Sequence, residues 1–458
     1  MSKLAFTDLD LPQSLLDSLA SIGYQSMTPV QSEVLPLALA GRDVIARAKT
    51  GSGKTVSFGL LTLANLNNSL FAPQSLVLCP TRELAEQITE VIRQLARATQ
   101  NVKVLTLTGG SSVRAQITSL EKGSHIIIGT PGRIEDHLGR GALQMEKINT
   151  LVLDEADRML QMGFQESIDR IIEQLPEKRQ TLLLSATYPD EIISIADRLL
   201  HSPAEINVDT EHTTGDIQQH FYPVDKQQDR TQALQLLLLK FKPENALIFC
   251  NTKIAVREVT ELLKDKGFAA IALHGDLEQK ERDRNLIRFA NRSATILVAT
   301  DVAARGIDIE KLDVVINYQL SKETDVHTHR SGRTGRAGES GMVWTLFDST
   351  DKHRIQQLEK VLGQSIKNYT LPPAHTLKER PAKPATVTLE INAGKKQKLR
   401  PGDILGALTC DGGLEGACVG KIKIQNTRAF VAIDRKLVKN AQELLKKIKG
   451  RSFKTRIL

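Results

Sequence analysis

The sequence predicts two consecutive α/β domains with parallel sheets, followed by a small α+β domain. Two observations support the first part: short β-branched runs recur without polar alternation, and a helix-length amphipathic stretch follows each of them. Such strands are buried on both faces, which is typical of a parallel sheet covered by helices. In the first domain the expected strands span residues 43–48, 75–80, 104–109, 126–130, 150–156 and 181–187.

A second α/β domain is expected after the polar stretch 208–216, where the same pattern resumes. Its expected strands span residues 245–250, 269–275, 295–301, 314–319 and 341–347. Residues 371–386 carry four of the 16 prolines and no apolar periodicity, which predicts an extended, flexible linker. The predicted boundaries are 1–208 for the first domain, 217–370 for the second, 371–386 for the linker and 387–458 for the C-terminal domain.

The C-terminal domain is expected to follow the order β-α-β-β-α-β. Strands are predicted at 387–391, 421–424, 429–433 and 453–458, with one helix entered at 400–403 and another over about 437–449. This order is the split βαβ plan of an α+β domain.

The positive charge of the chain is concentrated in this last domain. The chain has 61 Lys and Arg against 53 Asp and Glu, a net charge of +8. Residues 387–458 hold 16 basic and 6 acidic residues, a net of +10, so the other 386 residues hold 45 against 47, a net of −2. A polyanionic partner is therefore expected to bind the C-terminal domain.

The remaining composition indicates a globular protein of a reducing compartment. The four cysteines show no CxxC pairing, and no apolar run approaches the roughly 18–20 residues of a membrane span. The N-terminal residues include acids where a signal peptide would be apolar. We expect a cytoplasmic location and no membrane partner, whereas the sequence does not indicate an oligomeric state.

A phosphate-binding loop is expected between the first strand and the helix that follows it. Glycines let backbone N–H groups turn inward, and the helix N-terminus favours negative charge. Lys54 would reach the β- and γ-phosphates, and Thr55 would hold Mg²⁺. The candidate ATP contacts here are Ala48, Lys49, Thr50, Gly51, Ser52, Gly53, Lys54 and Thr55, with alanine in place of the usual first glycine.

A cluster of carboxylates follows the expected strand 150–156. Asp154, Glu155 and Asp157 stand at the carboxyl end of this strand, where ligands of α/β sheets gather. Alone, such a cluster is usually a solvated cap. Together with a phosphate loop, Asp154 can hold Mg²⁺ and Glu155 can activate water for attack on the γ-phosphate. The combination predicts an enzyme that hydrolyses a nucleoside triphosphate.

A dozen short motifs from about residue 6 to about 347 resemble, in order, those of the DEAD-box ATP-dependent RNA helicases. They include GY at 23–24, TP at 28–29, DEAD at 154–157, SAT at 185–187 and HRSGRTGR at 329–336. The resemblance implies two tandem RecA-like domains, RNA-stimulated ATP hydrolysis with Mg²⁺, and local unwinding of RNA. It further implies that Tyr24 stacks on adenine and Gln31 reads its edge.

The resemblance also implies further residue roles. Asp157, Ser185 and Thr187 would couple hydrolysis to strand separation, and the two hydroxyls are expected to bond to Asp157. Arg333 and Arg336 would stabilise charge on the transferring phosphoryl group from the second domain, and Asp301 would contact the ribose. The implied RNA contacts of the helicase core are Arg82, Gly110, Thr130, Arg133, Gln279, Arg282 and Thr300.

The C-terminal domain resembles the RNA-binding domain of the DbpA subfamily, through GKKQKLRPGDILGALT and GKIKI. Its element order is that of an RNA-recognition-like domain, but its central strands offer only Phe430 for base stacking, so phosphate contacts are expected instead. The candidates are Lys395, Lys396, Lys398, Arg400, Lys421, Lys423 and Arg428. The resemblance implies binding to a structured segment of large-subunit ribosomal RNA, in a pre-ribosomal particle, as a tethered module.

Two other functions stay open from the sequence. A DNA helicase would share the phosphate loop and the arginine motif, although DEAD and the motif around Gln31 argue against it. A nucleotide-gated RNA clamp would depend little on hydrolysis, which the presence of Glu155, Arg333 and Arg336 makes less favourable.

Overall fold

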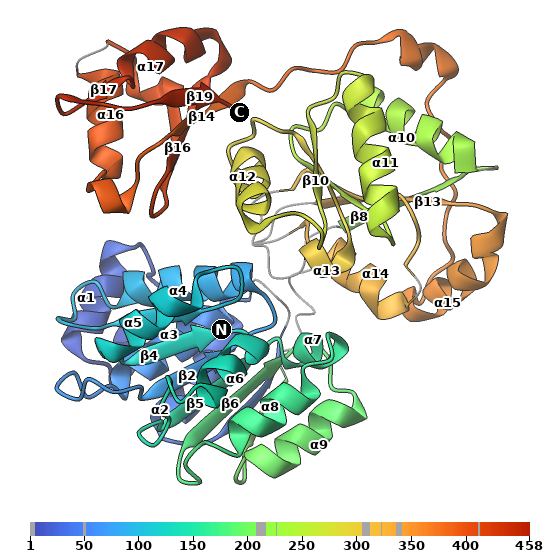
Figure 1. Cartoon of the computed structure of the whole chain (residues 1–458). Helices are drawn as coiled ribbons and strands as arrows, with labels where there is room; N and C mark the ends of the chain where they lie inside the picture. The colour runs from blue at the N-terminus through green and yellow to red at the C-terminus, as the bar shows by residue number, and fades with distance from the viewer. Residues whose placement is uncertain are drawn as a thin grey trace. The chain divides into compact units, whose positions relative to one another are not determined.

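The computed structural model describes residues 5–48, 52–207, 217–225, 227–304, 312–321, 323–335, 341–410 and 413–458, with the backbone alone at 227–229 and 325. The described chain forms two compact units, one ending near residue 211 and the other containing the rest of the helicase motifs and the C-terminal domain. The predicted fold class is confirmed: two parallel-sheet RecA-like domains precede a small domain with an antiparallel sheet (Figure 1).

The first unit is built on a seven-stranded parallel sheet in the order β3-β4-β2-β5-β6-β1-β7. Its strands are β1 Val44–Arg47, β2 Ser75–Leu78, β3 Val104–Leu107, β4 Ile126–Gly129, β5 Thr150–Asp154, β6 Gln180–Ser185 and β7 Ala204–Asn207. Its helices are α1 Gln13–Ser21, α2 Pro29–Leu39, α3 Lys54–Ala64, α4 Arg82–Leu95, α5 Val113–Glu121, α6 Pro131–Gly139, α7 Ala156–Gln161, α8 Gln165–Ile172 and α9 Asp190–Leu199.

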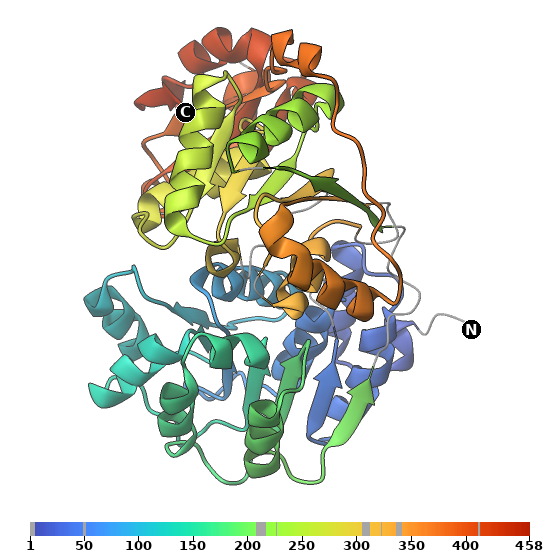
Figure 2. The same cartoon turned by 90° about the vertical axis from the view of Figure 1, so that its right-hand side faces the viewer.

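Two apolar clusters sandwich this sheet, which is why its strands lack polar alternation. One cluster gathers side chains of α1 to α4, and the other gathers side chains of α6 to α9. Figure 2 shows helices of the first unit on either side of its sheet. Strands β2, β4 and β5 are buried along their whole length. Since parallel strands end at the same edge, this arrangement brings the loops after β1, β5 and β6 together.

The second unit contains a six-stranded parallel sheet in the order β10-β11-β9-β12-β13-β8. Its strands are β8 Ile217–Pro223, β9 Ala246–Phe249, β10 Ala270–Leu273, β11 Ile296–Ala299, β12 Val314–Asn317 and β13 Gly341–Phe347. Its helices are α10 Gln227–Phe241, α11 Lys253–Asp265, α12 Gln279–Ala290, α13 Asp301–Ala304, α14 Thr324–Ser331 and α15 Lys352–Leu362.

The C-terminal domain has a four-stranded antiparallel sheet in the order β15-β16-β14-β19. Its strands are β14 Thr386–Ile391, β15 Val419–Ile424, β16 Ala429–Asp434 and β19 Thr455–Ile457, and its helices are α16 Pro401–Thr409 and α17 Val438–Leu444. The observed order of elements is the predicted β-α-β-β-α-β order with one addition: a small hairpin of β17 Lys447–Ile448 and β18 Arg451–Ser452 stands between α17 and β19.

This hairpin corrects the prediction of a helix over about 437–449. The helix ends at Leu444. Lys449 and Gly450 both have positive φ, 50° and 75°, which reverses the chain between β17 and β18. An αL pair of this kind favours a tight hairpin turn over a continued helix.

Candidate nucleotide and RNA sites

The phosphate loop stands between β1 and α3, as predicted. Gly53 has a φ of 93°, and α3 begins at Lys54. The Lys54 side chain is buried, and its Nζ donates to the carbonyl of Ala48 at 2.5 Å. Lys49, Thr50 and Gly51 lie outside the described residues. The ammonium group of Lys54 is thus held at the start of the loop, beside the N-terminus of α3, and helix N-termini favour phosphate binding.

Gln31 is tied to the end of this loop. Its Oε1 accepts from the Thr28 backbone N–H at 2.8 Å, and its Nε2 donates to the carbonyl of Gly53 at 3.1 Å. A Cβ on Gly53 would lie 2.6 Å from Gln31 Nε2, so this close approach requires glycine. Thr28 adds a bond from Oγ1 to the carbonyl of Ser52 at 2.9 Å. Gln31 therefore shapes the phosphate loop in the structure, a role that the sequence did not predict.

Tyr24 lies at the surface of the same unit, 38% exposed. The buried Phe6 supports its ring in an edge-to-face contact, with the centroids 6.3 Å apart. An aromatic ring that is held on one side and open on the other suits stacking on a base.

The acidic motif follows β5 and is buried despite its charge. Asp154, Glu155 and Asp157 are at most 6% exposed. Burial raises the pKa of Asp154 to about 6; the nearby Lys54 opposes this rise, and Glu155 adds to it. Asp154 Oδ1 is buried with no hydrogen-bond partner among the described residues. A buried carboxylate oxygen without a donor, beside a lysine, fits a cation ligand.

Glu155 adopts an unusual backbone conformation in this motif. Its φ of 53° places it in the left-handed region, immediately before the first turn of α7. Non-glycine residues rarely adopt this conformation, and functional sites are where it concentrates.

The hydroxyls of the SAT segment contact the acidic motif as expected. Thr187 Oγ1 donates to Asp157 Oδ2 at 2.9 Å, and the Thr187 backbone N–H donates to the same oxygen at 3.2 Å. Ser185 Oγ accepts from the Asp157 backbone N–H at 3.4 Å. The Ser185 carbonyl accepts from the backbone N–H of Ala48 at 3.1 Å. The SAT segment therefore connects the acidic motif with the start of the phosphate loop.

Two of the predicted RNA contacts in the first unit converge on the turn after β3. The guanidinium of Arg82 lies against Gly109, since a Cβ on Gly109 would stand 2.6 Å from Arg82 Nη2. Arg133 donates from Nη1 to the carbonyl of Ser111 at 3.2 Å. Gly110, between them, has a φ of 75°. Thr130 is the N-cap residue of α6, the helix that carries Arg133.

Arg330 is the central buried residue of the second helicase domain, and the sequence did not single it out. It is 1% exposed and donates to Asp301 through Nε and Nη2, both at 2.6 Å. It also bonds Asn251, Asn317 and the carbonyl of Gln319. In the structure, Asp301, the predicted ribose contact, forms an ion pair with Arg330. In sequence, Arg330 could not be told from the other arginines of its motif.

The remaining motif residues of this domain lie around α12 and α13. Arg282 donates to the carbonyl of Ala303 at 2.9 Å, and Thr300 Oγ1 accepts from the Ala303 backbone N–H at 3.4 Å. Gln279 begins α12 and donates to Asp283 at 2.8 Å. Three predicted RNA contacts therefore lie on two neighbouring helix ends. Arg333 is partly exposed in the turn after α14, and Arg336 lies outside the described residues.

In the C-terminal domain the predicted basic residues lie mostly at the surface. The backbone N–H groups of Lys395 and Lys396 donate to the carbonyls of Gln425 and Asn426, both at 2.9 Å. These bonds hold the loop after β14 against the β15–β16 turn. The exposed residues are Lys395, Lys396, Lys398, Arg400, Lys421 and Lys423. Arg428 differs, because it is mostly buried in an ion pair with Glu390 at 2.9 Å.

Comparison with known proteins decides the family. Residues 28–195 match the DEAD/DEAH box helicase model, 229–338 match the helicase conserved C-terminal domain, and 388–457 match the DbpA RNA binding domain. The chain is 46% identical over 461 residues to the ATP-dependent RNA helicase DbpA of Escherichia coli (strain K12). The alignment covers 99% of each of the two chains. The chain belongs to the DEAD-box RNA helicases, in the DbpA subfamily.

Other members of the family resemble mainly the helicase part. The DEAD-box ATP-dependent RNA helicase CshA of Geobacillus kaustophilus (strain HTA426) is 40% identical over 80% of this chain and 78% of its own. The solved structure of Dbp5 of S. cerevisiae bound to RNA and ADP BeF3 aligns with a TM-score of 0.73 and 31% identity, over 80% of this chain and 95% of that chain.

This DEAD-box protein is therefore an ATP-dependent RNA helicase with RNA as its partner, as the motifs predicted. Of the two alternatives, a DNA helicase disagrees with the family. Among the described residues, none of the helices is long and apolar enough to cross a bilayer.

Proposed function

We propose that this helicase acts in the cytoplasm on a structured segment of large-subunit ribosomal RNA, within a pre-ribosomal particle, and serves assembly of the large subunit. The observation that carries the proposal is the C-terminal domain, which matches the DbpA RNA binding domain and concentrates a net charge of +10 in residues 387–458. A basic domain fused to a helicase core raises the local concentration of the core near its target.

The ATP site is proposed to work through residues of both helicase domains. Lys54 contacts the phosphates, Tyr24 and Gln31 select adenine, and Asp301 contacts the ribose. Glu155 orients the attacking water, while Arg333 and Arg336 stabilise the charge that develops on the γ-phosphoryl group. The buried position of Lys54 and the strained backbone of Glu155 support these roles.

Mg²⁺ is proposed to bind Asp154 and the hydroxyl of Thr55. Both offer hard oxygen ligands, and the unpartnered Oδ1 of Asp154 supports the assignment. When bound, the ion neutralises charge on the phosphates. The charge of Lys54 opposes the rise in the pKa of Asp154 that burial causes, and so favours the charged carboxylate.

RNA is proposed to reach the core through Arg82, Gly110, Thr130 and Arg133 in the first unit and through Gln279, Arg282 and Thr300 in the second. If ATP and RNA each need both domains in one closed arrangement, each ligand stabilises the arrangement that the other requires. Hydrolysis is then stimulated by RNA, and the closed state bends one strand and displaces the other.

The proposal is tested by ATPase stimulation in the full chain. A fragment of large-subunit ribosomal RNA should stimulate more strongly than an unrelated structured RNA of equal length. The triple variant Lys395→Ala, Lys396→Ala and Lys398→Ala should lose this preference but keep stimulation by saturating unrelated RNA.

A matched triple variant in the same domain removes equal charge from the region of α17: Lys436→Ala, Lys439→Ala and Lys446→Ala. This control should keep the preference. Equal stimulation of the wild-type chain by both RNAs would overturn the proposed target.

A further inference from the structure

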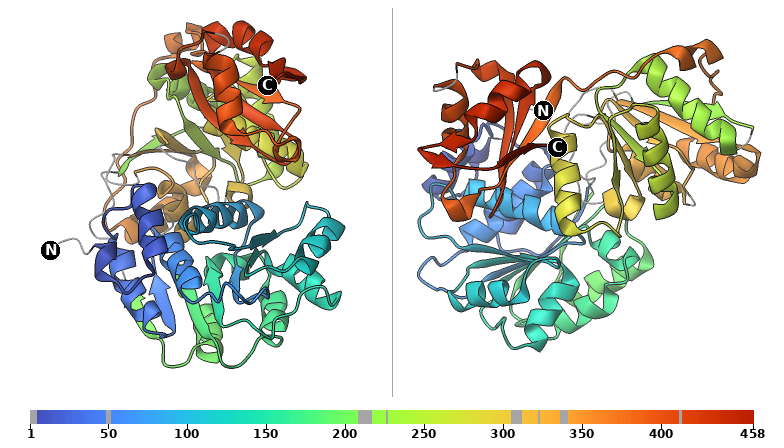
Figure 3. Two further views of the ribbon diagram at one scale, coloured as in Figure 1. Left: turned by 90° about the vertical axis from the view of Figure 1, so that its left-hand side faces the viewer. Right: turned by 45° about the horizontal axis from the view of Figure 1, so that its top comes forward.

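Helix α5 of the first unit turns a polar side chain toward the protein interior. All nine residues of α5 are described, and Gln116 alone among them is buried, at 6% exposed. Leu120 of α5 and Ile134 of α6 both pack on the apolar cluster that covers one face of the sheet. The teal segment that contains these two helices lies beside the sheet in Figure 1 and in Figure 3. A buried carboxamide needs hydrogen-bond partners, so Gln116 must bond to its neighbours.

The amide of Gln116 has one possible orientation. Its Nε2 donates to the carbonyl of Thr108, the residue after β3, at 3.0 Å. Because a carbonyl can only accept, the nitrogen must face Thr108, and Oε1 is left for residues of α6. There Oε1 accepts from Arg133 Nη1 at 2.8 Å and lies 2.8 Å from Nε2 of His137. One buried side chain thus joins the end of β3 to two residues of α6.

His137 is the second donor to this amide oxygen. It is 0% exposed, and its Nδ1 is buried with no hydrogen-bond partner among the described residues. Since Gln116 Oε1 can only accept, the proton of the neutral imidazole must stand on Nε2. Burial, together with the charge of Arg133, lowers the pKa of His137 and so favours the neutral ring. Arg133 and His137 are four residues apart, which places both side chains on one side of α6.

The same contacts hold the turn that carries Gly110, a predicted RNA contact. The carbonyl of Thr108, before the two glycines of this turn, accepts from Gln116. The carbonyl of Ser111, after them, accepts from Arg133 Nη1 at 3.2 Å. Gln116 therefore acts on both sides of the turn, directly at Thr108 and through Arg133 at Ser111. Side chains that are locked by such hydrogen bonds hold a binding group in one direction.

The partner that orients Arg133 is neutral. Asp136, which pairs with Arg133, lies 3.8 Å from its Nε and is closer to Arg140, at 2.8 Å. The amide oxygen of Gln116 lies 2.8 Å from the guanidinium and carries no charge. It therefore directs the guanidinium without cancelling the positive charge that a phosphodiester would need.

We propose that Gln116 and His137 are positioning residues for RNA binding by the first unit. Gln116 directs the Arg133 guanidinium and shapes the turn at Gly110, and the N–H of His137 keeps the Gln116 amide in place. Neither residue needs to touch RNA itself. The inference rests on the proposed RNA contacts of the core, and it names two residues that lie outside the motif contacts.

Two variants remove these contacts. Gln116→Met keeps the length of the side chain but loses the amide donor and acceptor, and His137→Leu loses the imidazole N–H. Each should raise the RNA concentration that half-saturates ATPase activity by about tenfold, because Arg133 loses its fixed direction. The rate at saturating RNA should change little, since the variants alter RNA binding and not the ATP site. His137→Gln, whose amide N–H can replace the imidazole N–H, should stay close to the wild type.

The matched controls are a buried glutamine and a buried histidine at the opposite edge of the same sheet. Gln74, just before β2, is 2% exposed and bonds to Asn67 and Leu70. His125, just before β4, is 0% exposed and accepts from the Lys103 N–H at 3.0 Å. Gln74→Met and His125→Leu should keep the wild-type half-saturating RNA concentration, whatever they cost in thermal stability. A general loss of stability is thereby distinguished from a loss of positioning.

The measurement is ATPase activity of the full chain, titrated with an unrelated single-stranded RNA. It includes Arg133→Ala and the double variant Gln116→Met with Arg133→Ala. If Gln116 acts through Arg133, the two effects should not add, and Gln116→Met should cause no further rise in the Arg133→Ala chain. Thermal unfolding shows which variants are folded at the assay temperature. If Gln116→Met is not folded, the comparison of His137→Leu with His137→Gln decides.

Three results would overturn the inference: a wild-type half-saturating concentration in Gln116→Met and His137→Leu, equal losses in His137→Leu and His137→Gln, or additive effects in the double variant. In each case a rise in Arg133→Ala would leave the proposed RNA contact of Arg133 standing. A wild-type value in Arg133→Ala would instead contradict that contact and remove the inference with it. The preference for ribosomal RNA is tested separately, by the ATPase comparison described above.

Discussion

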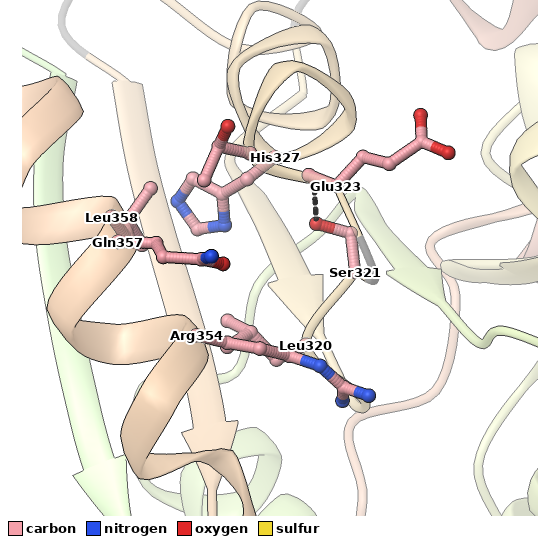
Figure 4. A pocket seen from close by; sticks show the side chains of 8 residues that line it. Leu320, Ser321, Glu323, His327, Arg354, Gln357 and Leu358 are labelled. Atoms are coloured by element: carbon pink, nitrogen blue, oxygen red, sulfur yellow. Dashed lines mark hydrogen bonds between the residues drawn. The ribbon is translucent and has the colours of Figure 1, made fainter.

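At the scale of single residues, His327 illustrates how burial fixes a protonation state. Its Nε2 is 3.0 Å from Gln219 Oε1, and its Nδ1 is buried without a hydrogen-bond partner among the described residues. Figure 4 shows the ring in a small pocket between α14 and α15, beside Gln357 and Leu358. Burial, assisted by the charge of Arg330, lowers the pKa of His327 to about 4. The imidazole is therefore neutral in the folded domain at neutral pH.

This lowered pKa makes the second helicase domain less stable in mild acid. Between pH 6.5 and pH 4 the unfolded chain binds a proton that the folded domain does not, so the stability contributed by His327 falls as the pH falls. From pH 7 to pH 5 the loss should be about 2 kcal/mol. Over the same pH range, the stability of His327→Gln should fall by about 2 kcal/mol less than that of the wild type. Urea unfolding followed by the fluorescence of Trp344, the single tryptophan, measures it.

The exposed His353 supplies the control for this prediction. His353→Gln should show the same pH dependence as the wild type, since the side chain of His353 is exposed to solvent in the folded domain. A wild-type stability that did not change between pH 7 and pH 5 would contradict the prediction.

At the scale of elements, the loops after β5 and β6 act as one unit. Asp157, in the first turn of α7 just after β5, and Thr187, in the loop after β6, share two hydrogen bonds, of 2.9 and 3.2 Å. The end of β6 also reaches the start of the phosphate loop, through the bond from the Ala48 N–H to the Ser185 carbonyl. A change at the nucleotide can therefore shift the acidic motif and the SAT segment together.

Thr187→Val should separate ATP hydrolysis from unwinding. It removes a hydroxyl bonded to a carboxylate, worth about 1.5–3 kcal/mol, without touching Lys54 or Glu155. We expect the unwinding rate of a short RNA duplex to fall about tenfold or more, while RNA-stimulated ATPase activity changes little. Strand displacement and phosphate release should be measured in parallel.

Thr181→Val is the matched control on β6. Thr181 Oγ1 is buried and has no hydrogen-bond partner in the part of the chain that the structure describes. This variant should keep both activities. Equal losses of ATPase activity and unwinding in Thr187→Val would argue against a coupling role.

The elements that the sequence predicted correctly are those with a strong local signal. Apolar runs between amphipathic stretches located β1 to β6 and β9 to β13 to within a few residues. Strands β7 and β8 were not predicted, since they are edge strands and β7 alternates buried and exposed residues. The β17–β18 hairpin was also missed, because its two-residue strands carry no periodicity.

The site was predictable where chemistry follows a motif and not where it depends on packing. The carboxyl ends of parallel strands meet at one edge, so the nearness of Asp154 to Lys54 follows from strand order. The bonds of Gln31 to the phosphate loop, and the burial of Arg330 beside Asp301, depend on side-chain directions across the sheet. No local pattern encodes those directions.

At the scale of the whole molecule, the net positive charge lies in one domain, and the central strands of that domain expose no aromatic ring. The C-terminal domain holds the net positive charge, and the rest of the chain is slightly acidic. The single aromatic of the central strands, Phe430, is buried. Capture of RNA by this protein should therefore depend on phosphate contacts and release of counterions, with little base stacking.

The salt dependence of RNA affinity tests this view of the whole chain. The logarithm of the affinity for a structured RNA should fall linearly with the logarithm of the salt concentration. Removing three of the proposed phosphate contacts with Lys395→Ala, Lys396→Ala and Lys398→Ala should reduce the magnitude of that slope by about 2. Phe430→Leu should leave the slope unchanged and the affinity within about twofold, whereas losing a stacked base would cost about 1–3 kcal/mol. An unchanged slope in the triple variant would mean that the lysines only solubilise the surface. A large loss of affinity in Phe430→Leu would mean that bases stack on Phe430.

Fluorescence anisotropy over 50–400 mM KCl measures the affinity and the slope. The three α17-region substitutions are the charge-matched control, because only residues that contact phosphate contribute to the slope.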